Sequence, residues 1–125
     1  MYKSLSTILI LSGNYKKLAD WYEKVLGLKV TWRSDHPEDT GVLFGFAGKE
    51  TDLWIGQHDR VKGKNKDVYR IMINIKVDSV TKVYKTLLKK GVKFEAKPFK
   101  APTLPYYFAA FYDPENNILQ LVGGK

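Results

Sequence analysis

The pattern of apolar and polar residues in the first half of the chain predicts one helix set among four strands. An apolar run at residues 5–11 is too short for a buried helix and is rich in Ile and Leu, which is typical of a strand. Apolar residues then recur at helical spacing between Asn14, a favourable N-cap residue, and Gly27, which stops the helix. The apolar helix face consists of Leu18, Trp21, Tyr22, Val25 and Leu26. Three further strands are expected at residues 28–33, 42–47 and 53–57.

The second half repeats this order of elements. A strand is expected at residues 69–77, and a helix begins near Ser79 and ends before Gly91. Asn14 and Ser79 lie 65 residues apart, and Gly27 and Gly91 lie 64 residues apart, so the two registers agree to within one residue. This matching order and spacing predicts an internal structural repeat. Three more strands complete the second half, at residues 92–96, 107–112 and 118–122.

A polar segment without periodicity at residues 59–68 separates the halves and predicts a linker. The length of 125 residues fits one domain. We therefore expect a single α+β domain made of two tandem β-α-β-β-β modules, at residues 1–58 and 69–125. In the second module, residues 97–106 contain three prolines and predict a long loop that could cover a binding site.

Composition excludes several classes of chemistry. Hydrophobic residues make up 44%, charged residues 27% and aromatic residues 14% of the chain, which is typical of a folded domain. Because the chain has no cysteine, it cannot form a disulfide framework, a thiol nucleophile or a cysteine-type metal site. No apolar run reaches the about 20 residues that a membrane-spanning helix needs, and no signal peptide is visible. We expect a cytoplasmic protein with no membrane contact.

The charge balance favours anionic partners. The 21 Lys and Arg residues against 13 Asp and Glu residues give a net charge of +8. However, only Arg33, Arg60 and Arg70 are arginine, the residue best suited to bidentate phosphate recognition, and the lysines are scattered. The charge therefore indicates a solvated basic surface rather than a nucleic-acid interface.

One segment in each module carries a recognisable motif. Residues 19–30 read Ala-Asp-Trp-Tyr-Glu-Lys-Val-Leu-Gly-Leu-Lys-Val, and residues 111–121 read Phe-Tyr-Asp-Pro-Glu-Asn-Asn-Ile-Leu-Gln-Leu. The first segment is similar to an aromatic-Tyr-x-x-x-Leu-Gly-hydrophobic motif, and the second to an Asp-Pro-x-Gly-Asn-x-hydrophobic-Glu-hydrophobic ending. Both motifs belong to the vicinal oxygen chelate superfamily of glyoxalases, bleomycin resistance proteins and extradiol dioxygenases. The chain resembles this superfamily over essentially its whole length.

The resemblance implies two curled four-stranded sheets around a funnel-shaped cavity, commonly completed by a second chain. In metalloenzyme members, the first and last strands of each module supply the ligands of a divalent ion: His or Gln, Glu, His and Glu. The positions carried over to this chain hold Thr7, Ile55 or Gly56, Met72 and Gln120. These side chains offer no negative charge and no imidazole to a metal ion. We therefore expect no metal site and no other cofactor.

The chain has two histidines. His36 lies in a polar stretch that predicts an exposed loop. His58 follows the fourth strand beside Asp59, where the alternatives are a solvent-facing side chain and a general base or hydrogen-bond donor at the mouth of the funnel. No phosphate loop, Ser-His-Asp order or zinc-protease helix is present, so catalytic residues stay unassigned.

Aromatic residues on the predicted strands are candidates for an apolar ligand site. Most would pack in the core, but alternation places about half of each strand's side chains on the concave face. Aromatic walls with a few polar groups suit a small-molecule site. The expected ligand-binding residues are Thr7, Trp32, Trp54, Gln57, His58, Arg70, Met72, Asn74, Tyr107, Phe108 and Gln120.

Three functions are compatible with these observations. The favoured one is a metal-independent binding protein, comparable in role to the drug-sequestering members of the superfamily, for a neutral or anionic aromatic molecule. The second is a metal-dependent enzyme of the same superfamily with displaced ligands, either a lyase of the lactoylglutathione type or a dioxygenase. The third, a nucleic-acid-binding module, is least favoured because the aromatics occupy predicted cores and no binding motif is visible.

We also expect a homodimer. Two open four-stranded sheets leave strand edges and apolar faces that a symmetric partner would cover. Candidate contact residues are Trp21 or Tyr22 on the first helix and the aromatic residues near Tyr107.

Overall fold

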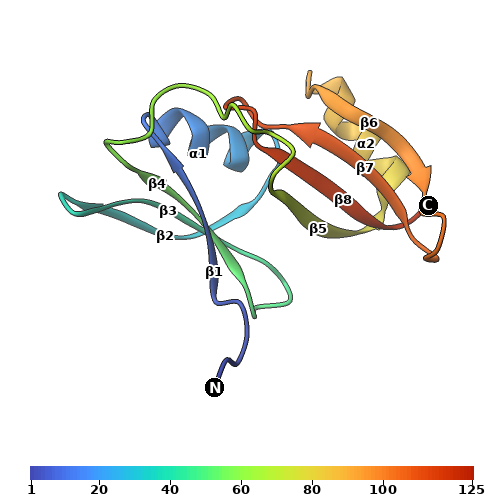
Figure 1. The fold of residues 1–125 in the computed structure, drawn as a ribbon, viewed down its shortest axis with the longest axis horizontal. Helices are drawn as coiled ribbons and strands as arrows, with labels where there is room; N and C mark the ends of the chain where they lie inside the picture. The colour runs from blue at the N-terminus through green and yellow to red at the C-terminus, as the bar shows by residue number, and fades with distance from the viewer. The chain divides into compact units, whose positions relative to one another are not determined.

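The computed structural model describes residues 1–125, which divide into two compact units at residues 1–63 and 64–125. Each unit has the element order β-α-β-β-β and a four-stranded sheet of its own (Figure 1). The boundary between the units falls inside the linker expected at residues 59–68. The α+β class and the tandem modules predicted from the sequence are confirmed.

The first unit packs one helix against one face of a mixed sheet. Its elements are β1 (Thr7–Ser12), α1 (Tyr15–Lys24), β2 (Lys29–His36), β3 (Asp39–Gly45) and β4 (Asp52–Gln57). The strands lie in the order β1-β4-β3-β2, with β1 parallel to β4 and the other pairs antiparallel. Tyr22 of α1 is fully buried, and its ring lies 6.3 Å from that of Phe44. Tyr22 therefore belongs to the core, and its expected role as a contact to a second chain is wrong.

The second unit repeats this arrangement. Its elements are β5 (Met72–Ser79), α2 (Val80–Lys89), β6 (Phe94–Lys100), β7 (Tyr107–Tyr112) and β8 (Ile118–Gly124). The strand order is β5-β8-β7-β6, again with one parallel pair, β5 with β8. The rings of Tyr84 and Phe94 lie 4.6 Å apart, and Phe94 lies 5.6 Å from Phe111, so α2 and the sheet share one aromatic core.

The helix boundaries follow local signals in the sequence. Gly27 and Gly91 have φ values of 72° and 82°, a left-handed conformation that glycine adopts without a steric penalty. Ser79 caps α2 by accepting a hydrogen bond from Lys82 N at 3.2 Å, whereas Asn14 precedes α1 without a side-chain cap. Neither helix is long and apolar enough to cross a membrane.

The prolines of residues 97–106 do not exclude a strand. β6 continues through Pro98 to Lys100, so the expected loop is shorter and occupies residues 101–106. β6 is the edge strand of its sheet, and its register shifts between Ala96 and Phe99. Proline is tolerated at such a position because its missing N–H removes no hydrogen bond between strands.

The hairpin between β2 and β3 is tighter than expected. Both strands extend into residues 34–41, where the sequence predicted a connection, and only Pro37 and Glu38 separate them. His36 is the last residue of β2 and is exposed, and its Nδ1 accepts a hydrogen bond from Glu38 N at 3.1 Å. It is a surface residue, although it lies at a strand end rather than in a loop.

Candidate functional site

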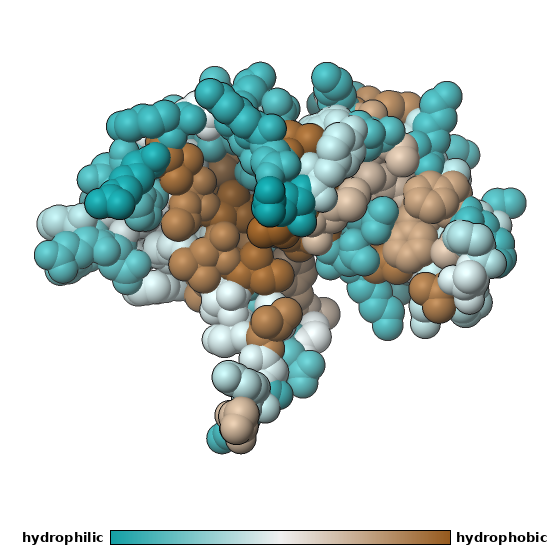
Figure 2. All heavy atoms as spheres, in the orientation of Figure 1, coloured by the Kyte–Doolittle hydropathy of each residue, from teal (hydrophilic) through white to brown (hydrophobic).

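Each helix covers one face of its sheet, and we call the opposite face the open face. In the first unit, Val42, Phe44 and Ile55 are buried on the side of α1. Since side chains alternate along a strand, the residues between them lie on the open face. Figure 2 shows hydrophobic residues gathered over the sheet of the first unit and bordered by hydrophilic ones.

One row of apolar side chains crosses the whole open face of the first sheet. Leu9 on β1 is paired with Trp54 on β4, Trp54 with Leu43 on β3, and Leu43 with Trp32 on β2. The two outer members are exposed, Leu9 by 58% and Trp32 by 51%. The row therefore offers apolar and aromatic surface to solvent at both ends.

Trp54 forms the floor of this row because two glycines leave room for its indole. A β-carbon on Gly41 would stand 2.5 Å from Trp54 Cζ2, and one on Gly56 would overlap the indole nitrogen. The indole lies over these glycines and is only 8% exposed. Its ring centroid is 5.8 Å from that of Trp32, with an interplanar angle of 32°. The pair forms an aromatic platform whose accessible ring is Trp32, on which a planar molecule could stack.

A polar pair lies next to the row. Thr7 Oγ1 donates a 2.6 Å hydrogen bond to Asp52 Oδ1, and the two residues are paired in register on β1 and β4. The predicted residues Thr7, Trp32 and Trp54 thus share the open face of one sheet.

The ligand positions that the resemblance implies do not form a metal site. Ile55 is fully buried on the side of α1, and Gly56 lies beneath the Trp54 indole. The register also shows which residues of the two units occupy equivalent positions. The pair Leu9 and Trp54, on β1 and β4, is equivalent to the pair Asn74 and Gln120, on β5 and β8. Trp54, rather than Ile55 or Gly56, is therefore the counterpart of Gln120.

The full donor set at these positions is a hydroxyl, an indole, a thioether and a carboxamide, from Thr7, Trp54, Met72 and Gln120. None of these groups has the charge or basicity that a divalent transition metal needs. No group of three or more His, Asp or Glu side chains is placed to hold a metal ion. The residues present therefore do not fit the metal of the enzymatic members.

Gln57 and His58 lie away from the row. Gln57 holds the start of α1, because its Oε1 accepts from Tyr15 N at 3.1 Å and its Nε2 donates to Gly13 O at 2.8 Å. The His58 side chain is 43% exposed, its Nδ1 accepts from Arg60 N, and the same atom is 3.6 Å from Asp59 Oδ1. Both residues make their hydrogen bonds to backbone atoms of the segments that follow β1 and β4, so they are not part of the aromatic platform.

In the second unit, four of the predicted residues share the open face. Asn74 and Gln120 are paired between β5 and β8, and Phe108 on β7 stacks with Phe99 at 5.8 Å. Met72 begins β5 and is also on this face, 41% exposed. Two others are placed differently. Tyr107 alternates to the same side of its strand as Phe111, and Arg70 precedes β5 and is bound to Asp67 at 2.5 Å.

The second unit also contains an acid–phenol cluster that was not expected from the sequence. Tyr69 Oη donates to Glu95 Oε1 at 2.9 Å, and Tyr112 Oη donates to Glu95 Oε2. The hydrogen bond from Tyr112, followed by that from Tyr69, lowers the pKa of Glu95, and the bond to Glu95 raises the pKa of Tyr112. Lys93 Nζ lies 5.6 Å from the centre of the Tyr112 ring. The one signal of this cluster in the sequence is that Glu95 is the single acidic residue of β6, which also contains two lysines.

Tandem β-α-β-β-β units, each with a parallel outer pair of strands, define the glyoxalase-like class of α+β folds. The model of the Glyoxalase/Bleomycin resistance protein/Dioxygenase superfamily matches residues 4–121. The chain therefore belongs to this superfamily. It is 28% identical over 122 residues to the uncharacterized protein YraH of Bacillus subtilis (strain 168), covering 94% of this chain and 95% of the relative.

Solved structures share the fold over almost their full length. SMU.1112c superposes with a TM-score of 0.83 at 17% identity, covering 98% of this chain and 99% of the other. TnmS3, an antibiotic binding protein from Streptomyces sp. CB03234, has a TM-score of 0.79 at 16% identity, with coverages of 99% and 98%. At these identities the similarity establishes the fold alone.

Proposed function

We propose that this protein binds a small aromatic molecule, neutral or anionic, without a metal ion, and that the open face of the first sheet supplies the binding surface. The observation that carries the proposal is the platform of Trp54, which lies over Gly41 and Gly56, and Trp32, whose ring centroid is 5.8 Å from that of Trp54. A fixed platform loses little conformational entropy when a ligand stacks on it. The antibiotic binding protein TnmS3 shares the fold, which supports small-molecule binding as the kind of function.

The charge of the ligand follows from the charge of the protein. Residues 64–125 contain 12 Lys and Arg against 5 Asp and Glu, a net +7, whereas residues 1–63 contain 9 against 8, a net +1. The net charge of the whole chain, +8, disfavours a cationic ligand, whereas the first unit alone is close to neutral. On the open face of the first sheet, Asp52 Oδ1 accepts a hydrogen bond from the Thr7 hydroxyl, so one oxygen of this carboxylate is already occupied.

The direct test is a calorimetric titration with three naphthalene derivatives of equal size and different charge: 2-naphthoate, 2-naphthamide and 2-naphthylmethylammonium. We expect saturable binding of the first two and the weakest binding for the ammonium compound. Trp32→Ala should weaken binding by about tenfold, because aromatic stacking contributes about 0.5–1.5 kcal/mol beyond its buried area. Leu104→Ala, at a residue that is similarly exposed but lies in the second unit, should leave the affinity unchanged. Equal affinity for all three compounds, or for the Trp32→Ala variant, would contradict the proposal.

Metal independence has its own test. Protein purified without chelator is analysed for its metal content, and the naphthoate titration is repeated with EDTA. We expect substoichiometric metal and an unchanged affinity. Stoichiometric Zn²⁺, Ni²⁺, Mn²⁺ or Fe²⁺ that is lost on substitution of His58 or His36 would instead support the lyase or dioxygenase alternative with displaced ligands.

We further propose that the two units act as one domain in a homodimer in the cytoplasm. Exposed apolar residues on the first unit, such as Leu5 at 70% and Leu9 at 58%, and the free edges of both sheets favour association. Sedimentation velocity at micromolar concentration should give twice the chain mass of 14.4 kDa. A single species with the mass of one chain would contradict the dimer.

A further inference from the structure

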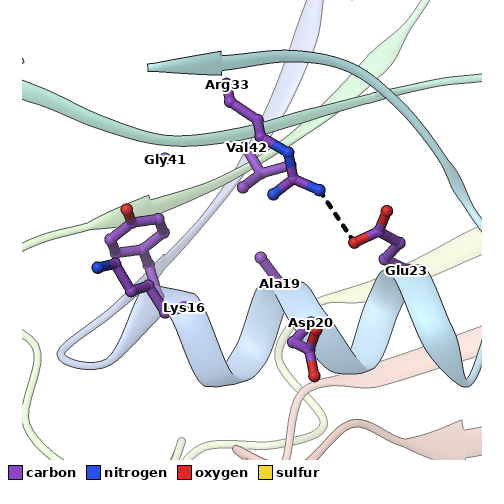
Figure 3. A pocket seen from close by; sticks show the side chains of 8 residues that line it. Lys16, Ala19, Asp20, Glu23, Arg33, Gly41 and Val42 are labelled. Atoms are coloured by element: carbon purple, nitrogen blue, oxygen red, sulfur yellow. Dashed lines mark hydrogen bonds and ion pairs between the residues drawn. The ribbon is translucent and has the colours of Figure 1, made fainter. Parts of the chain in front are cut away.

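A small cleft lies on the opposite side of the first sheet, between α1 and the β2–β3 hairpin (Figure 3). Its volume is about 270 Å³. One side of α1 forms one wall, through Tyr15, Lys16, Ala19, Asp20 and Glu23. The cleft is independent of the aromatic platform, so its role does not rest on the function proposed above.

A small residue of α1 faces the sheet at the floor of the cleft. Ala19 is buried and points toward the strands, and Gly41 and Val42 of β3 form part of the opposite wall. A β-carbon on Gly41 would meet the Trp54 indole at 2.5 Å, so it would point to the open face, and Gly41 lines the cleft with its backbone alone.

Charged groups of both signs surround this apolar floor. Arg33 of β2 points across the cleft at Glu23, and its Nη2 donates to Glu23 Oε1 at 3.0 Å (Figure 3). This bond uses one of the five N–H donors of the guanidinium. Lys16 contributes a second cation, and Asp20, which is paired with Lys24 at 2.8 Å, contributes a second carboxylate.

The charges determine what kind of molecule fits. A simple carboxylate would be attracted by Arg33 but repelled by Glu23, and a simple ammonium ion would be attracted by Glu23 but repelled by Arg33. A molecule with both charges pairs with both sets of groups and leaves no like charges adjacent. We propose that this cleft binds a small zwitterion of the α-amino acid type, with its carboxylate on Arg33 and its ammonium group toward Glu23.

The size of the cleft sets a second limit. Pockets for drug-sized ligands measure about 300–1,000 Å³, so this cleft lies just below their lower bound. An amino acid with an aliphatic side chain fits this volume, and its side chain can cover Ala19 and Val42. L-Leucine is therefore the probe of choice.

The test compares L-leucine with two compounds that each lack one of its charges: 4-methylpentanoate, without the ammonium group, and 3-methylbutylamine, without the carboxylate. Binding is followed through the amide chemical shifts of Ala19, Gly41 and Val42 in ¹⁵N–¹H spectra of the full chain. We expect saturable shifts with L-leucine and affinities at least about tenfold lower for both partial compounds, since a hydrogen bond to a charged group contributes about 1.5–3 kcal/mol.

Matched variants assign the contacts. Arg33→Gln should weaken L-leucine binding by about tenfold. Arg60→Gln and Lys17→Gln remove the same kind of exposed charge outside the cleft and should change nothing. The proposal is overturned if L-leucine gives no saturable shift at these amides, if either partial compound binds as tightly, or if Arg33→Gln binds like the unaltered protein.

Discussion

Trp54 lies directly over Gly41, so closely that a β-carbon on Gly41 would stand 2.5 Å from Trp54 Cζ2. The two residues are on neighbouring strands, β4 and β3. Gly56, which is paired with Gly41 in register, supports the indole nitrogen in the same way. A large aromatic side chain can therefore lie flat on the sheet instead of standing upright from it.

Adding a single methyl group beneath the indole should destabilise the protein. Gly56→Ala forces the Trp54 ring off the sheet, and overpacking of this kind costs about 1–3 kcal/mol. Urea unfolding at equilibrium measures the loss. Gly48→Ala is the matched control, because a β-carbon there meets nothing within 4 Å. Similar stabilities for the two variants would show that the indole is not held by the glycine surface.

The two members of the aromatic platform should differ in their contribution to stability. Trp54→Ala should lower the free energy of unfolding by about 3–5 kcal/mol, because the ring is 8% exposed and its removal leaves a cavity. Trp32→Ala, at a ring that is 51% exposed, should cost less than half as much. The same urea experiment decides this, and equal losses would contradict the assignment of Trp54 as floor and Trp32 as accessible wall.

Asp113 should stabilise the turn between β7 and β8. The residue is 3% exposed, and its carboxylate accepts hydrogen bonds from Glu115 N at 2.8 Å and from Asn117 N at 3.0 Å. Asp113→Ala leaves these donors without their charged acceptor, so we expect a loss of about 2–4 kcal/mol in urea unfolding. Asp35→Ala, at an exposed position, should stay within about 0.5 kcal/mol of the unaltered protein.

The pKa of Glu95 should depend on the phenol of Tyr112. The hydrogen bond from Tyr112 lowers the pKa of Glu95 in the folded state, so Tyr112→Phe should raise the pKa toward its ordinary value of about 4.3. Carboxyl ¹³C chemical shifts, followed against pH, measure both values. Tyr69→Phe should give a smaller shift in the same direction, because its bond is the weaker of the two causes.

The same bond links stability to pH. Because the pKa of Glu95 is lower in the folded than in the unfolded state, its contribution is present above the unfolded value and is lost as the pH falls through the folded value. The difference in stability between the unaltered protein and Tyr112→Phe should therefore shrink as the pH is lowered below about 4. A constant difference across this range would show that Glu95 does not respond to Tyr112.

Local signals in the sequence determined the elements and their order. The spacing of apolar residues located both helices, and Gly27 and Gly91 ended them because each takes a left-handed φ that other residues avoid. The 64- to 65-residue offset between these signals revealed the repeat, and two motifs indicated the superfamily. These features depend on neighbouring residues, so they can be recognised without knowledge of distant contacts.

Only the tertiary structure decided which side chains meet. Side chains alternate between faces with a period of two, so an error of one residue in register exchanges the buried and open faces. Pairing between β1 and β4, about 45 residues apart, placed Trp54 beside Leu9 and turned Ile55 toward α1. The aromatic platform and the charged cleft both arise from such long-range pairing, which no local pattern of residues specifies.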